Sequence, residues 1–350
     1  MSGWMDEARL THILDRFASV NLLVLGDYFL DCYLTMDRNL SEISLETNLE
    51  AYQVIEMRKY PGAAGTVAGN LRSLEVNVTA LGICGDDGNG YDLRKKLAAI
   101  QINPDTLLRC PDRFTPTYNK PMMREPDGHE HELNRMDVKN RLPLPEEVEQ
   151  QIIMKLRELL PHVDGVLVVD QVKERNCGVV TDRVREEIQS LARSHPQKLF
   201  MVDSRDFAGL YQDVIIKTNL SEAVKAANYS ADMPLSSEQI KACCRTIYGR
   251  THRPIIITRG ERGAIIYQGE PESLSEIPTY QVSGPIDIVG AGDSVSASTG
   301  AALCAGASLE EAVFIGNLTA SLIIQQIGVT GSTTRARILE RYHEFIGQKA

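Results

Sequence analysis

Short runs of consecutive apolar residues, separated by helical patterns, place the strongest constraint on how this chain can fold. Within each run the apolar residues follow one another without polar alternation, which indicates a strand buried on both faces of a sheet. The strands expected on this ground are Asn21–Gly26, Val76–Ile83, Gly165–Asp170, Lys198–Asp203, Val214–Lys217 and Pro254–Thr258. The helical patterns are Gly65–Ser73, Tyr91–Ile100, Pro145–Leu160, Val179–Arg193, Ser236–Tyr248 and Gly292–Ala305. This alternation predicts an α/β fold with a doubly wound, mostly parallel sheet flanked by helices.

Two polar segments interrupt the alternation. Asp31–Tyr60 and Phe114–Asp137 contain short alternating runs, such as Tyr52–Met57, that are typical of β-hairpins outside a main sheet. We expect them to form a small β-sheet lid inserted in a single domain that spans residues 1–350. A chain of 350 residues, 43% of them hydrophobic, can bury the core of one such large domain.

Charge and cysteine content exclude several classes of function. The net charge of −10 argues against a nucleic-acid or membrane-surface role, because both need basic patches. It still allows an anionic small molecule, held by a local cluster of Lys and Arg. The seven cysteines are odd in number and lack a CxxC spacing, so we expect free thiols in a reducing compartment. Met1–Arg16 has the pattern of an amphipathic helix that includes Trp4, not of a signal peptide, so we expect a soluble, cytoplasmic protein.

The segment Pro285–Gly306 joins a Gly-rich turn, Gly290-Ala291-Gly292-Asp293, to a run of small, helix-compatible residues. The first N–H groups of a helix have no partner within it, and together with the helix dipole they form a site for anions. A carboxylate beside such a site can accept the proton of a hydroxyl group during phosphoryl transfer. The alternative is that Asp293 only caps the helix, and the turn alone does not decide between the two.

Other catalytic and metal-binding patterns are absent or incomplete. The sequence has no GxxxxGK[ST] loop, no HRD and DFG pair and no HExxH motif. His129 and His131 would share one face of a strand, but a third metal ligand is not apparent. Gly85–Gly90 (GDDGNG) is expected to form a turn before a helix, because a calcium loop would need a later bidentate Glu.

Three further patterns follow expected strands or begin helices, where open α/β sheets bind ligands. Pro61–Asn70 (PGAAGTVAGN) has small residues that permit either close approach of a ligand or tight helix–sheet packing. Asp27 and Asp31 place two carboxylates at the end of the first strand. Asn219–Glu222 and Thr258–Gly263 each follow a strand and can reach the same edge of the sheet.

Four of these motifs, PGAAGTVAGN, Asn219–Glu222, Thr258–Gly263 and Asp287–Asp293, follow one another along the chain in the order typical of the ribokinase-like (PfkB) carbohydrate kinases, which the chain resembles. That family has a Gly-rich segment in its first third and a D-T-x-G-A-G-D segment near its end, and PGAAGTVAGN and Asp287–Asp293 (DIVGAGD) are similar to them. The NxxE motif matches Asn219 and Glu222, and the TxGxxG motif matches Thr258, Gly260 and Gly263. The resemblance extends from Gly26 to about Gly328.

Within the family, the chain is most similar to the kinase half of the bacterial D-glycero-β-D-manno-heptose-7-phosphate kinase/adenylyltransferases. The similar stretches include GDYFLDCYL, SEISLETN, LGICGDDGNG and GNLTASLIIQQIG. Gly62-Ala63 stands where these kinases have Gly-Gly, Gly65-Thr66 where they have Ala-Asn, and Ile288-Val289 where they have Val-Thr. No HxGH nucleotidyltransferase segment occurs before Ala350, so adenylyltransferase activity is not expected of this chain.

The resemblance implies an ATP-dependent kinase that uses Mg²⁺, with K⁺ as a further possible cation. Asp293 would be the catalytic base, and the backbone of Gly290, Ala291 and Gly292 would bind the transferred phosphoryl group. The residues implied for the nucleotide are Asn219, Glu222, Thr258, Gly260, Gly263 and Asn317. Glu222 would act on Mg²⁺ through water, and Asp287 is implied for a monovalent cation.

The resemblance also implies a sugar-binding side, whose residues would be Asp27, Asp31, Gly62, Ala63, Lys120, Arg135, Asp170 and Arg205. Lys120, Arg135 and Arg205 are the candidates for a phosphate group on the substrate. The expected substrate is a sugar or sugar phosphate similar to D-glycero-D-manno-heptose 7-phosphate, and the lid is expected to form a homodimer. Two alternatives remain open: a kinase of another sugar phosphate or a nucleoside, and a non-catalytic sugar-phosphate-binding protein.

Overall fold

A nine-stranded sheet forms the centre of the described part of the protein. The structure is a computed structural model that describes residues 5–230, 234–270, 274–328 and 331–349. The strands of the sheet, in spatial order, are β16 (Leu274–Ile277), β15 (Ala264–Tyr267), β14 (Ile255–Thr258), β13 (Ile215–Asn219), β12 (Leu199–Ser204), β11 (Gly165–Asp170), β1 (Asn21–Gly26), β6 (Asn77–Gly85) and β7 (Leu107–Cys110). Neighbours from β7 to β14 pair in parallel, whereas β15 and β16 pair antiparallel at one edge.

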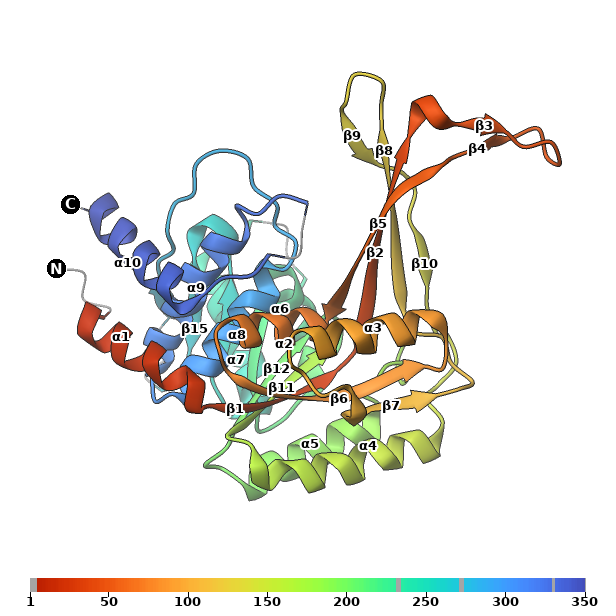
Figure 1. Ribbon diagram of the computed structural model, residues 1–350. Helices are drawn as coiled ribbons and strands as arrows, with labels where there is room; N and C mark the ends of the chain where they lie inside the picture. The colour runs from red at the N-terminus through yellow and green to blue at the C-terminus, as the bar shows by residue number, and fades with distance from the viewer. Residues whose placement is uncertain (1–4, 231–233, 271–273, 329–330, 350) are drawn as a thin grey trace.

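The two faces of this sheet carry separate hydrophobic cores, which explains the consecutive apolar residues of its strands. In β1, Leu22 and Val24 point into one core, whereas Leu23 and Leu25 point into the other. The first core is covered by α1 (Glu7–Arg16), α2 (Ala64–Ser73), α3 (Gly88–Ala99), α8 (Ala291–Cys304), α9 (Leu309–Ile323) and α10 (Arg335–Lys349). The second is covered by α4 (Glu146–Leu159), α5 (Asp182–Ser194), α6 (Leu220–Ala226) and α7 (Ser237–Thr251). Figure 1 shows α4 and α5 below the sheet and α2 and α3 above it.

The predicted fold class is confirmed, and each of the six predicted strands and six predicted helices is present with ends that differ by a few residues. The predicted N-terminal helix is present as α1, which Asp6 caps by accepting a hydrogen bond from the Arg9 N–H. Trp4 lies outside the described residues. None of the described helices combines the length and apolar character that a bilayer crossing requires. The seven cysteines form no disulfide within the described residues.

A second sheet stands above the main one (Figure 1) and is built from two separated parts of the chain. Its strands are β2 (Tyr28–Asp37), β5 (Val54–Ala63), β8 (Thr117–Arg124), β9 (Glu130–Glu132) and β10 (Met136–Val138). β2 pairs antiparallel with β5 and parallel with β8. A small hairpin of β3 (Glu42–Ile43) and β4 (Glu50–Ala51) extends from its far end. We call this sheet, with the hairpin, the lid.

The order of the strands places a ligand crevice beside β1. From β1 the chain first moves outward to β6 and β7, and it later returns through the lid and α4 to β11 on the other side of β1. Such a reversal opens a crevice at the carboxyl ends of the strands, which is where open α/β sheets bind ligands. The lid begins directly after β1, so it stands over this crevice.

Candidate active site

A cleft of about 720 Å³ lies between the lid and the carboxyl edge of the main sheet. The lid contributes Phe29, Asp31 and Tyr118 to its walls, and the sheet contributes residues at the ends of β12, β13 and β14. The residues expected from the sequence that line it are Asp31, Ala63, Arg205, Asn219, Glu222, Thr258, Gly260, Gly263, Gly290, Ala291, Gly292, Asp293 and Asn317. The fold therefore brings together segments that are more than 250 residues apart in the chain.

The start of α8 forms one wall of the cleft. Gly290 adopts the left-handed conformation with φ of +78°, and no side chain caps the helix. The Ala291 N–H donates to the Ile288 carbonyl oxygen at 3.2 Å, so the N–H groups of this turn that can bind an anion from the cleft are those of Gly290, Gly292 and Asp293. No described residue donates a hydrogen bond to the Asp293 carboxylate, so Asp293 does not act as a cap in the structure.

Its surroundings raise the pKa of Asp293 to about 7. Burial is the main cause, and the negative charge of Asp203 adds to it. The positive charges of Lys217 and Arg205 act in the opposite direction and limit the rise in pKa. A carboxyl group with a pKa near neutrality is suited to accept a proton from a hydroxyl group.

Lys217 is a cleft residue that the sequence reasoning did not identify. It is buried on β13, its Nζ lies 2.7 Å from Oδ2 of Asp203, and a Cβ built on Gly292 would lie 3.1 Å from that Nζ. The ammonium group therefore lies against the first turn of α8. Burial lowers its pKa, but the nearby carboxylates, Asp203 above all, outweigh this effect and the net pKa is raised. The sequence did contain an indication of this residue. Lys217 ends the apolar run Val214–Lys217, and a lysine buried at the end of a strand needs an oppositely charged partner.

Asp203, which the sequence analysis gave only as the end of an expected strand, completes this cluster. Its Oδ2 also accepts a hydrogen bond from Ser296 Oγ, at 2.7 Å. Ser296 belongs to α8, so Asp203 connects the ends of β12 and β13 to that helix. The cluster fixes the position of Lys217 relative to Asp293.

Asn219 and Glu222 lie at the start of α6 and form a capping box. Asn219 Oδ1 accepts from the Glu222 N–H at 2.9 Å, and Glu222 Oε2 accepts from the Asn219 N–H at 2.9 Å. Thr218 also donates to Oε2, whereas Oε1 accepts no hydrogen bond from the described residues. The capping box thus fixes Glu222 and leaves one carboxylate oxygen directed to other partners.

The remaining residues implied for the nucleotide border the other end of the cleft. Gly263 has φ of +72°, and a Cβ there would lie 2.1 Å from the Ile277 carbonyl oxygen, so only glycine fits. Asn317 is buried and donates to the carbonyl oxygens of Ile277 and Pro278. Asn317 therefore positions the chain after β16, which forms this wall.

On the sugar side, Asp31 is the carboxylate that faces the cleft. It lies on β2 with Oδ1 3.6 Å from Lys120 Nζ, and burial raises its pKa in spite of this lysine. A Cβ on Gly62 would lie 3.0 Å from Asp31, so glycine leaves room for that carboxylate. Ala63 lines the cleft with φ of +51° and ψ of −115°, a backbone conformation that residues other than glycine rarely adopt.

Asp27 and Asp170 do not line the cleft. Asp27 is 3% exposed, and its carboxylate accepts three backbone hydrogen bonds, from Gln171, Val172 and Val179. It thereby holds the loop after β11. Asp170 is buried and accepts hydrogen bonds from Ser204 and Tyr211, and burial raises its pKa to about 7. In this structure both carboxylates join segments of the protein.

The three basic residues considered for a substrate phosphate differ in their surroundings. Lys120 is buried between Asp31 and the Tyr33 hydroxyl, to which its ammonium group donates a hydrogen bond. Arg135 is exposed on the lid and forms an ion pair with Asp137 at 3.1 Å. Arg205 is exposed in the cleft, and no described residue forms an ion pair with it or accepts a hydrogen bond from its guanidinium group.

Asp287, the His129/His131 pair and the Gly85–Gly90 turn were the three features considered for metal ions. Asp287 accepts hydrogen bonds from the N–H groups of Val289 and Gly328, and it joins these two loops. His129 and His131 stack at the end of the lid with ring centroids 5.9 Å apart. Asp87 in the Gly85–Gly90 segment caps α3 by accepting from the Gly90 N–H, so this segment forms the predicted turn. The described residues contain no group of three or more potential metal ligands.

The parallel sheet, the lid and the anion site at the start of α8 define a ribokinase-like α/β protein. The model of the pfkB family carbohydrate kinases matches residues 21–336. The chain belongs to this family, and it is a carbohydrate kinase.

Curated relatives of known name match almost the whole chain. The bifunctional protein HldE of Trichlorobacter lovleyi is 29% identical over 339 residues, which cover 96% of this chain and 65% of that protein. HldE of Desulfatibacillum aliphaticivorans is 29% identical over 315 residues, covering 89% of this chain and 61% of the relative. The chain thus spans somewhat less than two thirds of the length of these relatives.

Solved structures of the same fold cover nearly the whole chain as well. Phosphofructokinase-2 from Escherichia coli, in complex with potassium, matches with a TM-score of 0.69 at 18% identity, covering 93% of this chain and 99% of that one. Ribokinase from Arabidopsis thaliana, complexed with ribose and ATP, matches with a TM-score of 0.66 at 17% identity, covering 92% and 98%.

Proposed function

We propose that this kinase transfers the γ-phosphoryl group of ATP to a hydroxyl of a sugar phosphate similar to D-glycero-D-manno-heptose 7-phosphate. The observation that carries the proposal is the position of Asp293, a carboxylate with a raised pKa in the first turn of an uncapped helix that faces the cleft. The choice of substrate follows from the two HldE proteins, which are bifunctional heptose 7-phosphate kinase/adenylyltransferases and which the chain resembles over most of its length.

In the proposed reaction, Asp293 accepts the proton of the sugar hydroxyl as its oxygen bonds to the γ-phosphorus and the bond to the β-phosphate oxygen breaks. The N–H groups of Gly290 and Gly292 stabilise the negative charge on the transferred group, and the Ala291 N–H, which donates to Ile288, holds the turn that carries them. Lys217 lies against the same turn and adds a fixed positive charge. Asp31 accepts a hydrogen bond from a second hydroxyl and orients the sugar.

The residues on the nucleotide side fit a hydrated Mg²⁺ and the ATP phosphates. When bound, Mg²⁺ neutralises part of the phosphate charge and keeps most of its waters. Glu222 Oε1 is available to accept hydrogen bonds from those waters, while Oε2 holds the helix cap. Thr258, Gly260, Gly263 and Asn317 border the nucleotide in this proposal. A role of Asp287 beside K⁺ stays a prediction. In the structure its carboxylate accepts two backbone hydrogen bonds, from Val289 and Gly328.

A kinase of another sugar phosphate is the second candidate, and one observation favours it. Ala63 and Thr66 line the cleft where the heptose kinases have glycine and asparagine. The Thr66 methyl would lie 3.6 Å from a Cβ on Gly290, which places it beside the anion site. These changes affect the choice of sugar and leave the phosphoryl-transfer residues intact.

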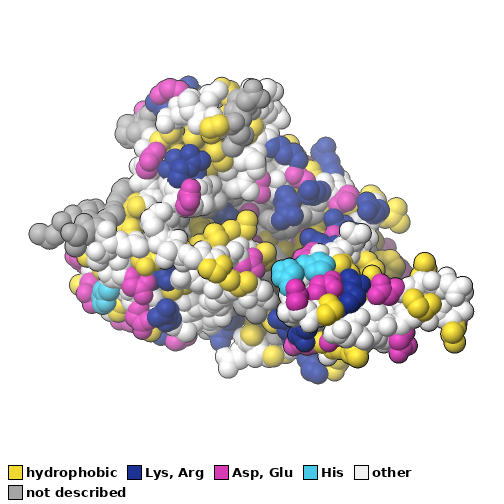
Figure 2. Space-filling view, turned by 90° about the horizontal axis from the view of Figure 1, so that it is seen from above, with side chains coloured by type: hydrophobic (Ala, Val, Ile, Leu, Met, Phe, Trp, Pro, Cys, Tyr) yellow, Lys and Arg dark blue, Asp and Glu magenta, His cyan; other side chains and the backbone are white. Residues whose placement is uncertain are grey.

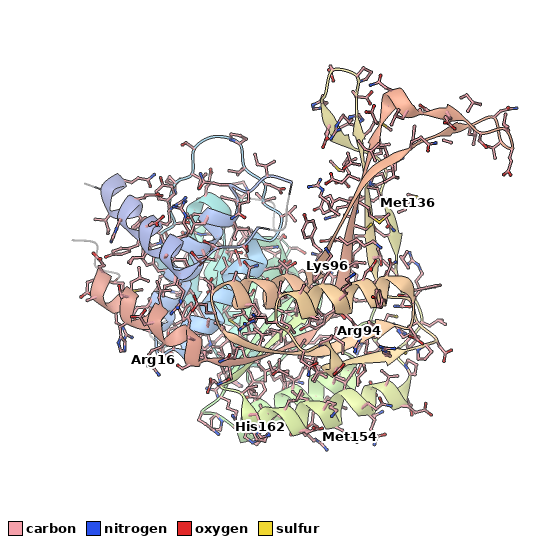
Figure 3. The ribbon with its side chains drawn as sticks, in the orientation of Figure 1. Arg16, Arg94, Lys96, Met136, Met154 and His162 are labelled. Carbon is pink, nitrogen blue, oxygen red and sulfur yellow. The ribbon has the colours of Figure 1, made fainter. Side chains whose placement is uncertain are left out.

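We further propose that residues 1–350 act as one kinase domain that forms a homodimer through the lid. The lid carries several apolar side chains that are exposed in the single chain, namely Ile43, Leu45, Leu49, Val54, Ile55, Met57 and Met136. Figure 3 shows Met136 at the outer side of this sheet. Burial of such side chains against a second lid would stabilise an association of two chains.

The test of the main proposal is an ADP-release assay on the purified protein with a panel of sugars and sugar phosphates, beside Asp293→Asn. We expect sugar-dependent ADP release by the native chain, and a kcat lower by several orders of magnitude in the variant with little change in ATP binding. Near-native turnover by Asp293→Asn would remove this residue as the base. Absence of turnover with every sugar would support a non-catalytic sugar-phosphate-binding protein.

A further inference from the structure

A side pocket opens from the sugar end of the cleft and contains a group of basic residues. The pocket is small, about 30 Å³, and it shares Phe29, Tyr118, Gln171 and Arg205 with the cleft, so a phosphate would lie where the pocket opens into the cleft. Lys139 and Lys173 line the pocket together with Arg205. Lys139 follows the last lid strand, Lys173 follows β11 and Arg205 follows β12, so three separate segments bring positive charge to one place. Lys and Arg side chains also gather beside the lid in the view from above (Figure 2).

These three cations lack the partners that most basic residues of the chain have. No described carboxylate forms an ion pair with Lys139, Lys173 or Arg205. The one carboxylate in the pocket, Glu174, lies 3.5 Å from Arg141, so its charge is already balanced. Three unpaired cations that line one pocket provide positive charge for binding a dianion.

The pocket also offers a neutral donor and an aromatic platform. Lys139 Nζ lies 5.6 Å from the centre of the Tyr118 ring. Burial raises the pKa of Tyr118 to about 12, so its hydroxyl stays protonated, and no described residue hydrogen-bonds to it. A phosphate group can accept hydrogen bonds from ammonium, guanidinium and phenol groups at once.

We propose that the pocket lined by Lys139, Lys173 and Arg205 binds the phosphate of a phosphorylated sugar whose opposite end presents its reacting hydroxyl to Asp293. This inference rests on the proposed kinase function and makes it more specific. It assigns the phosphate to Arg205, Lys139 and Lys173, because Lys120 and Arg135 are paired with Asp31 and Asp137, although the Arg135 guanidinium lies 4.7 Å from the centre of the Tyr118 ring. It selects a sugar that already carries a phosphate over a free sugar or a nucleoside.

The experiment compares the native chain with a Lys139→Gln, Lys173→Gln double variant, which removes both charges and keeps much of each side chain. The substrates are D-glycero-D-manno-heptose 7-phosphate, fructose 6-phosphate and the two unphosphorylated sugars, in the ADP-release assay. We expect the KM for a phosphorylated sugar to rise roughly 10- to 100-fold, because two charge-assisted hydrogen bonds are lost, with little change in kcat or in the KM for ATP. Arg135→Ala should have a smaller effect. Lys96→Gln, on the exposed face of α3 (Figure 3), is the matched control and should change neither value.

The outcomes separate this inference from the proposed function. A native chain that phosphorylates only free sugars, or a double variant that raises the KM of both kinds of sugar equally, would overturn the phosphate pocket and leave the kinase intact. If no sugar supports ADP release, the same pair of proteins is compared by calorimetric titration with heptose 7-phosphate. Binding that is lost in the double variant supports the pocket, and equal or absent binding in both proteins overturns it.

Discussion

The surroundings of Asp293 favour its proposed role as a base but lower the stability of the fold when its carboxylate is charged. Burial and Asp203 raise its pKa to about 7, which suits a base, but the same surroundings make its charged form costly. In the unfolded chain its pKa would be near the ordinary value of an aspartate. The group therefore stabilises the fold fully only at low pH, and this contribution is lost as the pH rises through about 7.

The first prediction follows from this sign. At pH 8, Asp293→Asn, which cannot ionise, should unfold at a higher urea concentration than the native chain. Its free energy of unfolding should be higher by on the order of 2 kcal/mol. The difference should shrink as the pH falls from 8 to 5, because the native carboxyl group then becomes neutral. Urea unfolding of both proteins across this range checks it. A variant that is less stable at pH 8 would contradict the raised pKa.

Ala63 gives a second prediction at the scale of one residue. Its φ of +51° and ψ of −115° suit glycine, so Ala63→Gly should relieve strain and stabilise the fold by about 1 kcal/mol. The control is Ala68→Gly, in the buried middle of α2, which should destabilise by at least about 1 kcal/mol. Thermal unfolding measures both changes. If both variants lose stability, Ala63 is not strained.

At the scale of elements, the ends of β12 and β13 and the start of α8 act as one charged unit. Asp203 holds Lys217 on one side and Ser296 on the other, and Lys217 lowers the pKa of Asp293. None of these contacts lies within one element, so each depends on parallel strands ending at the same edge of the sheet. Lys217 thus affects the protonation of Asp293, the proposed base, which is 76 residues away in the sequence.

The third prediction concerns this unit. Lys217→Met should raise the pKa of Asp293 further, so the acidic limb of kcat/KM against pH should move to higher pH by about one unit. The activity should also fall at all pH values, because a phosphate-facing charge is lost. Lys225→Met, which removes an exposed lysine paired with Asp206, is the control and should leave the profile in place. A uniform loss of activity without a shift would indicate only a structural role for Lys217.

For the whole molecule, the lid borders the cleft and carries the apolar surface that we propose for association with a second copy. Phe29, Asp31 and Tyr118 of the lid form part of the cleft wall, so movement of the lid would open or close the sugar side. Its outer surface exposes apolar side chains, of which Leu45 is 99% exposed. A monomer would leave these side chains in water, which is unfavourable.

The fourth prediction tests the dimer. The native chain, with a mass of 38.8 kDa, should elute with a light-scattering mass twice that value, and Leu45→Glu with Met57→Glu should elute as a monomer. Met154→Glu, on an exposed position of α4 (Figure 3), is the matched control and should stay dimeric. A native chain of single mass at micromolar concentration would contradict association through the lid.

Local apolar patterns in the sequence were sufficient to predict the strands, the helices and the class of fold. The sequence also indicated the Gly-rich turn before Asp293, since glycine spacing and a helix start are local features. It misjudged the surroundings of Asp27, whose carboxylate is occupied by three backbone N–H groups, and it did not identify Lys217. The partner of a buried charge lies on another strand, which a local pattern does not specify.

Which charges remain unpaired, and which groups surround Asp293, depends on the packing of segments that are distant in the sequence. Whether Lys120, Arg135 or Arg205 is available to a ligand depends on carboxylates brought beside them by the lid and the sheet. In the same way, the pKa of Asp293 depends on burial and on Asp203 and Lys217, which reach it from two other strands. The residue types can be read from the sequence, whereas their ion-pair partners and pKa values depend on how distant segments pack together.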